Sequence, residues 1–164
     1  MRTITTILLL EDMESDQLLI QRVLKQAGIQ AAIQVCDNKS DYTFYIENNH
    51  IDMILADFHV PGFDSYDALQ ISRSNNILTP FVFVTGSVPA ELAADTVINE
   101  ADAYVLKDNL IRLPTVIQEL WKSLQPLNRA LEEREKIRLL SEKFDLHKQK
   151  LEAILKNNEI NTIL

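Results

Sequence analysis

Five polar residues directly follow short apolar segments of the chain, and their types suit phosphoryl chemistry. They are Glu11, Asp12, Asp57, Thr85 and Lys107. Three carboxylates held together repel one another by roughly 3 kcal/mol per pair at about 5 Å and an effective dielectric constant near 20. A magnesium ion, which prefers oxygen ligands, would offset that repulsion. One carboxylate could then attack a phosphoryl group, while the lysine and the hydroxyl hold its remaining oxygens.

Each of these residues has an ordinary explanation when it is taken alone. Glu11 and Asp12 are typical of acids at the start of a helix, where the helix dipole favours negative charge. Asp57 suits a loop or a helix cap, Thr85 suits a turn, and Lys107 suits a solvated surface. Their joint occurrence at successive strand ends, in order along the chain, favours a shared site instead.

The apolar segments predict strands, and the amphipathic segments between them predict helices. The predicted strands are residues 4–10, 31–36, 51–56, 81–84 and 103–106. The predicted helices are residues 15–27, 40–49 with Ser40 as the N-terminal cap, 64–74, 89–99 and 113–124. This strict alternation predicts an α/β fold with a parallel sheet and helices on both faces. Such sheets bind ligands beyond the carboxyl ends of their strands, where the five polar residues would meet.

Composition limits the class of protein. Of the 164 residues, 46% are apolar and 24% are charged, as is usual in globular domains. Residues 1–125 hold 8 Lys and Arg against 17 Asp and Glu, so the acidity of the chain arises there. An acidic domain lacks the basic patch that nucleic acids require, and no apolar run is long enough to span a membrane. The single cysteine, Cys36, excludes a disulfide framework, and the acidic start differs from a signal peptide, so we expect a cytoplasmic protein.

The order and spacing of these segments resemble the receiver domains of two-component response regulators. The matching stretches are ILLLEDMESD, MILADFHVPGFDSYDAL, FVFVTGS and ADAYVLKDNL, and the resemblance covers residues 4–124. It implies a flavodoxin-like (βα)5 fold whose five-stranded parallel sheet has the order 2-1-3-4-5. Residues 1–125 would form the receiver domain and residues 126–164 a helical extension.

The resemblance also implies a metal site and a phosphoryl acceptor. Glu11, Asp12 and Asp57 would hold Mg²⁺, together with the backbone carbonyl of His59. Asp57 would accept a phosphoryl group from a histidine kinase or a histidine phosphotransfer protein.

The remaining implied roles concern the response to phosphorylation. Thr85 and Lys107 would contact the phosphoryl group. Tyr104 would be the switch aromatic, which turns inward when Thr85 moves toward the phosphate. The domain would then be a signalling switch that catalyses only its own phosphorylation and dephosphorylation.

The chain departs from the family pattern at several positions. Asp108 stands where the family usually has a proline, so that loop must be built differently. Ser65 and Glu100 stand where glycine is common, which predicts altered turns. His59 and Ser87 occupy positions that tune the lifetime of the phosphate in the family.

The segment after Pro126 predicts a helix with a short apolar seam. Apolar residues and one histidine follow the a/d spacing of a coiled coil: Ala130, Ile137, Leu140, Phe144, His147, Leu151 and Ile154. We expect a homodimer through the last receiver helix and this tail. The alternatives are a tail that folds back on the domain or frays, and Pro126 would break or bend the helix.

His147 and the end of the chain lead to two further interpretations. His147 fits a polar seam residue better than a phosphorylated histidine, because Lys148 follows it where an acid is usual. The tail resembles helices that link a receiver to a sensory or output domain, so the chain could be the N-terminal segment of a longer hybrid kinase or output protein.

Two other functions fit parts of the pattern. A phosphatase with an aspartyl phosphate intermediate would place a second acid two residues after Asp57, but His59 stands there. A receiver-like dimerisation adaptor would need no phosphorylation, but the complete set of five polar residues argues against this alternative. The ring of His59 is a poor ligand for Mg²⁺, which prefers oxygen.

Overall fold

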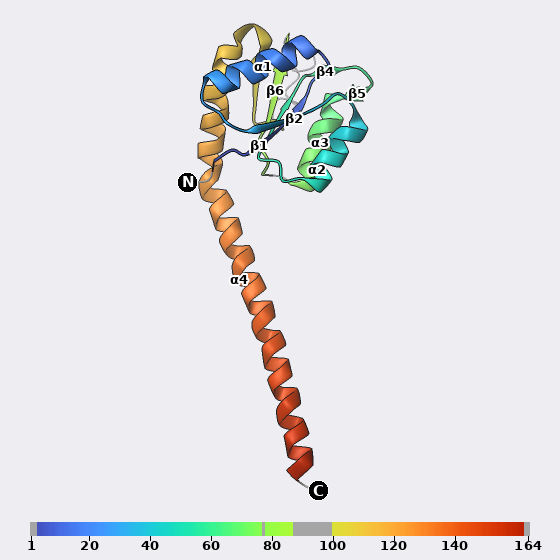
Figure 1. Ribbon diagram of the computed structural model, residues 1–164, viewed down its shortest axis with the longest axis vertical. Coiled ribbons are helices and arrows are strands. Elements are labelled where there is room, and N and C mark those ends of the chain that lie inside the picture. Colours follow the sequence, from blue (N-terminus) through green and yellow to red (C-terminus); the bar gives the residue numbers. More distant parts are fainter. Residues whose placement is uncertain (1–2, 77, 87–99, 163–164) are drawn as a thin grey trace. The chain divides into compact units, whose positions relative to one another are not determined.

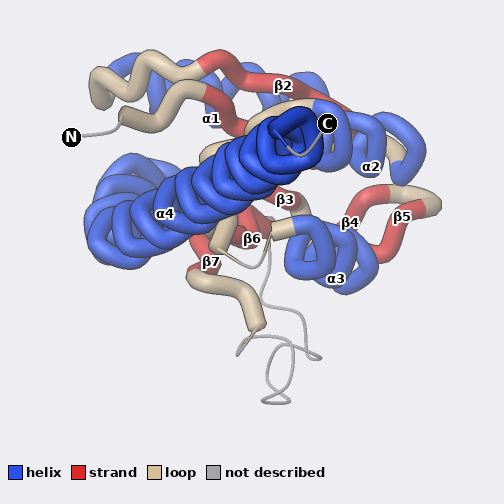
Figure 2. Tube along the Cα trace, turned by 90° about the horizontal axis from the view of Figure 1, so that it is seen from below, coloured by secondary structure: helices blue, strands red, loops and turns tan. Residues whose placement is uncertain are grey.

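The first part of the chain is built on a five-stranded parallel sheet. The computed structural model describes residues 3–76, 78–86 and 100–162, and the chain divides into two compact units, Met1–Leu124 and Gln125–Leu164. The strands are β1 (Thr6–Leu10), β2 (Ala32–Cys36), β3 (Met53–Ala56), β6 (Phe81–Thr85) and β7 (Ala103–Leu106). They lie in the order β2-β1-β3-β6-β7, and Figure 2 shows β2, β3, β6 and β7 following one another in this order. Counted along the chain, this is 2-1-3-4-5, which confirms the expected topology.

Helices cover both faces of this sheet. They are α1 (Glu14–Gln26), α2 (Lys39–Asn48), α3 (Ser65–Asn75) and the first turns of α4 (Leu113–Thr162). Helices α1 and the start of α4 cover one face of the sheet, and α2 and α3 cover the other (Figure 1). Their buried side chains form one hydrophobic cluster on each face. The predicted helix at residues 89–99 lies outside the described residues.

Alternate residues of each strand face opposite hydrophobic layers. In β1, Leu8 and Leu10 pack with α2 and α3, whereas Ile7 and Leu9 pack with α1 and α4. All four side chains are completely buried. Because both faces of the sheet are covered, its central strands need apolar residues at every position, which explains runs such as ILLL and FVFV. The two packed layers hold the strand ends in place, and the site residues project from those ends.

Capping side chains fix the first residues of two helices, α2 and α3. Asn38 caps α2, and its side chain accepts a hydrogen bond of 2.9 Å from the backbone N–H of Asp41. The prediction of Ser40 as the cap is therefore wrong, because Asn38 already provides the acceptor and Ser40 lies inside the first turn. Asp64 caps α3 by accepting a hydrogen bond of 2.7 Å from the N–H of Tyr66. Such caps satisfy amides that lack a helical partner.

Two short elements beside the strand ends were not predicted. Strands β4 (His59–Val60) and β5 (Phe63–Asp64) form an antiparallel hairpin between β3 and α3, separate from the main sheet in Figure 2. Pro61 and Gly62 form its turn, and Gly62 has a φ of +74°, which favours glycine. After β7 the chain enters a 3₁₀ helix, η2 (Lys107–Arg112), which leads directly into α4.

The second unit is helical up to Thr162 as the continuation of α4. Pro126 lies inside this helix and therefore does not end it. The apolar side chains of the predicted seam are between 55% and 70% exposed: Ile137, Leu140, Phe144, Leu151 and Ile154. None of the helices in the described part of the chain is long and apolar enough to cross a membrane.

Asp52 ties the start of β3 to the start of the chain at the amino edge of the sheet. Its buried carboxylate accepts hydrogen bonds from the Thr5 N–H at 2.8 Å, the Thr5 hydroxyl at 2.6 Å and the Thr6 N–H at 3.1 Å. The other carboxylate oxygen lies 3.0 Å from Nε2 of His50. Burial alone would raise the pKa of Asp52, but these hydrogen bonds outweigh it and lower the pKa. The charged carboxylate therefore stabilises the fold.

We expect Asp52→Asn to lower the free energy of unfolding at pH 7 by about 1–3 kcal/mol, because an amide replaces a charged acceptor of several hydrogen bonds. The pKa of Asp52 is lower in the folded chain than in the unfolded one, where it is near 3.8. This contribution is therefore present above about pH 4 and is lost as the pH falls through the folded pKa.

Urea unfolding of both proteins at pH 7 and at successively lower pH measures this difference. The control is Asp67→Asn, which removes an exposed carboxylate 3.2 Å from Lys39 and should change stability by less than about 0.5 kcal/mol. Equal stability of Asp52→Asn and the wild type at pH 7 would contradict the prediction.

Candidate functional site

The backbone pairing of the central strands brings the first acids together. Glu11 and Asp12 directly follow β1, and Asp57 directly follows β3. Leu10 and Ala56 are partners in the register of these two strands. The backbone N–H of Asp57 continues the pairing with a hydrogen bond of 2.8 Å to the Leu10 carbonyl. The carboxylates are therefore held at one edge of the sheet by main-chain structure.

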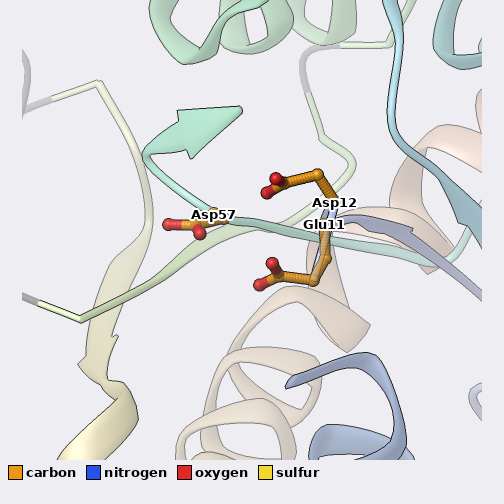
Figure 3. Close-up of side chains that lie close together, drawn as sticks. All are labelled: Glu11, Asp12 and Asp57. Atoms are coloured by element: carbon orange, nitrogen blue, oxygen red, sulfur yellow. The ribbon is translucent and has the colours of Figure 1, made fainter. Parts of the chain in front are cut away.

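The three carboxylates form a close cluster. One oxygen from each of Glu11, Asp12 and Asp57 lies within 4.8 Å of the other two. Glu11 is completely buried, Asp57 is 6% exposed and Asp12 is partly exposed. Figure 3 shows Glu11 and Asp12 extending from the end of β1 towards Asp57. The structure thus brings together the three acids that the sequence pattern grouped.

Lys107 is the positive charge of the site. Its Nζ lies 2.7 Å from Oε2 of Glu11, 2.7 Å from Oδ2 of Asp57 and 2.6 Å from Oδ2 of Asp16. Burial alone would lower the pKa of the Lys107 ammonium, but the hydrogen bonds to Asp16 and Asp57 and the ion pair with Glu11 outweigh it and raise the pKa. The lysine therefore stays charged and holds acids from three different elements.

Glu11 shows that the cluster suits a cation. Its Oε1 accepts a hydrogen bond of 3.0 Å from the N–H of Met13. Its Oε2 is buried and accepts no well-aligned hydrogen bond, although Nζ of Lys107 lies 2.7 Å away. Burial, with a smaller contribution from the charge of Asp57, raises the pKa of Glu11. The three acids offer only oxygen ligands, and the single Lys107 ammonium does not balance their negative charge. Such a site fits Mg²⁺ better than a metal that prefers nitrogen or sulfur.

Asp16 is the site residue that sequence reasoning missed. It lies in the first turn of α1, and its side chain is 30% exposed. The other charged residues of the site directly follow strands, whereas Asp16 reaches Lys107 from a helix. The sequence feature that could have identified Asp16 is its place as an acid in the first turn of a helix that starts just after Glu11 and Asp12. With Asp16, three carboxylates contact the ammonium, and Asp12 adds a fourth acid beside Glu11 and Asp57.

Asp57 and His59 are linked through the backbone. Oδ1 of Asp57 accepts a hydrogen bond of 3.2 Å from the N–H of His59. The His59 residue is exposed, and its ring packs edge-on against Phe58 with centroids 5.2 Å apart. Among the described residues, the acidic cluster of Glu11, Asp12 and Asp57 does not include this ring. The role of the His59 carbonyl as a metal ligand stays a prediction.

The remaining candidate residues follow the outer strands. Thr85 ends β6, which pairs with β3, and its side chain is completely buried at the same edge as Asp57. Tyr104 lies in β7 and is 48% exposed, so it points to the surface rather than into the acidic cluster. Asp108 lies in η2 and is exposed. Ser87 lies outside the described residues.

Comparison with known sequences identifies the first unit. The sequence profile of the response regulator receiver domain matches residues 7–118. The chain is 30% identical over 81 residues, 49% of its length, to the autoinducer 1 sensor kinase/phosphatase LuxN of Vibrio campbellii. That match covers only 9% of LuxN, so this chain corresponds to a small part of the sensor kinase.

Solved structures share the fold. One is the receiver domain of a sensor histidine kinase from Pseudomonas aeruginosa PAO1, described with a magnesium ion in its active-site cleft. It has a TM-score of 0.63 and 21% identity, over 72% of this chain and 98% of that one. Another is the response regulator TrrA from Thermotoga maritima in complex with Mg²⁺ and BeF, with a TM-score of 0.62 and 20% identity over 71% and 98% of the two chains.

At these identities the solved structures show the fold alone, whereas the receiver profile covers more than half of the chain. The profile, the strand order and the acidic cluster at the carboxyl edge agree. This protein belongs to the response regulator receiver domains of two-component signalling.

Proposed function

We propose that Asp57 accepts a phosphoryl group from the phosphohistidine of a histidine kinase or phosphotransfer protein, with Mg²⁺ bound beside it. The observation that carries the proposal is the position of Asp57. One of its oxygens lies close to Glu11 and Asp12, and Oδ2 lies 2.7 Å from the Lys107 ammonium. A carboxylate between a cation site and a fixed ammonium is suited to attack a negatively charged group.

The reaction uses the residues of this edge in turn. An oxygen of Asp57 attacks the phosphorus, the phosphorus–nitrogen bond breaks, and its electron pair stays with the leaving imidazole. Lys107 and the Thr85 hydroxyl then hold oxygens of the transferred group. Thr85 and Tyr104 carry the change to the surface of β6 and β7. Attack by water on the phosphorus restores Asp57 and resets the switch.

The metal would be held by Glu11, Asp12 and Asp57 with the backbone carbonyl of His59. When bound, Mg²⁺ supplies positive charge that offsets the repulsion between the Asp57 carboxylate and the phosphoryl oxygens. The buried, poorly paired Oε2 of Glu11 supports this assignment. The magnesium ions described for the Pseudomonas and Thermotoga relatives support it further.

The exposed seam of α4 supports a homodimer as the output of the switch. In a parallel coiled coil, Ile137, Leu140 and Phe144 would pack against the same residues of a second copy. Arg138 forms ion pairs within the helix with Glu135 and Glu142 at 2.5 Å and 2.9 Å. In the heptad these three residues occupy outward positions, so the charged face and the apolar face of the helix are distinct.

Mass spectrometry after treatment with acetyl phosphate and Mg²⁺ tests the proposed acceptor. The wild type should carry one phosphoryl group, and Asp57→Asn should carry none, because an amide is not a nucleophile for phosphorus. The control Asp67→Asn should be labelled like the wild type. An unlabelled wild type would favour the adaptor, and rapid turnover without an adduct would favour a phosphatase.

Removing Lys107 should strengthen magnesium binding, because its ammonium contacts Glu11 and Asp57 and competes with a cation for their oxygens. We expect Lys107→Met to raise the affinity for Mg²⁺ about tenfold, which corresponds to about 1.4 kcal/mol, and to slow phosphorylation. Isothermal titration calorimetry at constant ionic strength measures the affinity. Lys39→Met, which removes an exposed lysine, is the control, and an affinity equal to or below that of the wild type would contradict the prediction.

Phe144→Glu should convert the dimer to a monomer, because it places a charge in the apolar seam. Leu146→Glu is the matched control, since this residue is 51% exposed but lies off the seam. Analytical ultracentrifugation measures both. Beryllofluoride with Mg²⁺ should change the dimer Kd of the wild type, and an unchanged Kd would rule out the dimer as the output.

A further inference from the structure

Asp16 differs from the other acids of the site because it contacts the lysine from outside the metal-binding cluster. Its Oδ2 lies 2.6 Å from Nζ of Lys107. It is not among the three carboxylates of the described residues whose oxygens lie within 4.8 Å of one another. It also comes from a helix, whereas the cluster comes from strand ends. Lys107 therefore has one partner outside the cluster and two partners, Glu11 and Asp57, inside it.

The two kinds of partner have different consequences for a cation. An ammonium has three N–H donors, and each one given to Glu11 or Asp57 occupies an oxygen that a metal would use. The well-aligned hydrogen bonds of Lys107 go to Asp16 and Asp57, at 2.6 Å and 2.7 Å. The contact with Glu11 is short but poorly aligned. Asp16 thus holds the ammonium without using a metal ligand.

We infer that Asp16 is a positioning residue for Lys107. From α1, Asp16 anchors the Lys107 ammonium, so that the ammonium can release the oxygens of Glu11 and Asp57 to Mg²⁺. The lysine then stays beside Asp57, ready for the oxygens of an incoming phosphoryl group. This inference rests on the proposed function. Without Asp16, the lysine keeps only partners inside the cluster and competes more strongly with the cation.

Calorimetric titration with Mg²⁺ tests the first consequence. Asp16→Asn should bind Mg²⁺ about three- to tenfold more weakly than the wild type. A change of this size corresponds to the interaction energies usually measured between two residues in contact. Glu14→Gln is a matched control, because it removes the same charge from the same turn of α1 at an exposed residue. It should change the affinity by less than about twofold. Equal losses in the two variants would overturn the inference.

A double-mutant cycle separates positioning from a direct effect of the Asp16 charge on the cation. In the Lys107→Met background, Asp16→Asn should change the affinity for Mg²⁺ by less than about twofold, because the group that it positions is gone. The same loss with and without Lys107 would show that Asp16 acts on the cation itself, and would overturn the inference.

Adduct formation with beryllofluoride, followed by ¹⁹F NMR, gives an independent measurement. The Mg²⁺ concentration for half-maximal adduct should rise in Asp16→Asn by the factor found by calorimetry, while the maximal adduct stays unchanged. Asp16→Glu keeps a carboxylate for the ammonium and should resemble the wild type. A wild type that binds no Mg²⁺ and forms no adduct would overturn the proposed function as well. A wild type that does both, with Asp16→Asn equal to it, would overturn this inference alone.

Discussion

One ammonium group among four carboxylates is the interaction on which this site depends. Lys107 lies 2.6–2.7 Å from oxygens of Glu11, Asp16 and Asp57, and Asp12 adds a further negative charge. Removing one partner of a buried ion pair commonly costs about 3–5 kcal/mol, because the other charge is left uncompensated. The lysine therefore allows acids to be buried at the edge of the sheet. One positive charge does not neutralise four negative ones, so the cluster keeps a net negative charge that would favour a cation.

The sheet supplies the stiffness that this charge imbalance requires. Repelling carboxylates would move apart if their strands could shift, but the layers on both faces pack against every central strand.

Two buried acids at opposite edges of the sheet, Asp52 and Glu11, differ in how their charge is compensated. Hydrogen bonds from Thr5 and Thr6 satisfy Asp52 and lower its pKa. Glu11 lacks such a set, and burial raises its pKa. Asp52 stabilises the fold, whereas Glu11 would bind the metal ion under the proposed function.

The sequence predicted the parts of the molecule that depend on periodic burial. Parallel strands covered on both faces appear as apolar runs, and the acids and the lysine were found because they directly follow those runs. Asp16 was missed because it depends on the direction of a helical side chain, which strand ends do not reveal. The β4–β5 hairpin and η2 were missed because elements of only a few residues are too short to show a periodic pattern of apolar residues. Ser40 was mistaken for a cap because Asn38, two residues earlier, satisfies the same rule.

Lys107 also connects the site to the rest of the chain, because it is the first residue of η2, and η2 leads into α4. A change in the oxygens that hold the ammonium would therefore act at the first residue of the segment that leads into α4. Under the proposed function, a phosphoryl group on Asp57 brings new oxygens to the lysine and weakens its hold on Asp16 or Glu11. A ligand shifts an equilibrium only as far as its contacts differ between the two states. A charged hydrogen bond contributes about 1.5–3 kcal/mol. Exchanging one such bond could shift the conformational equilibrium about ten- to hundredfold, which is enough for a switch without any rearrangement of the sheet.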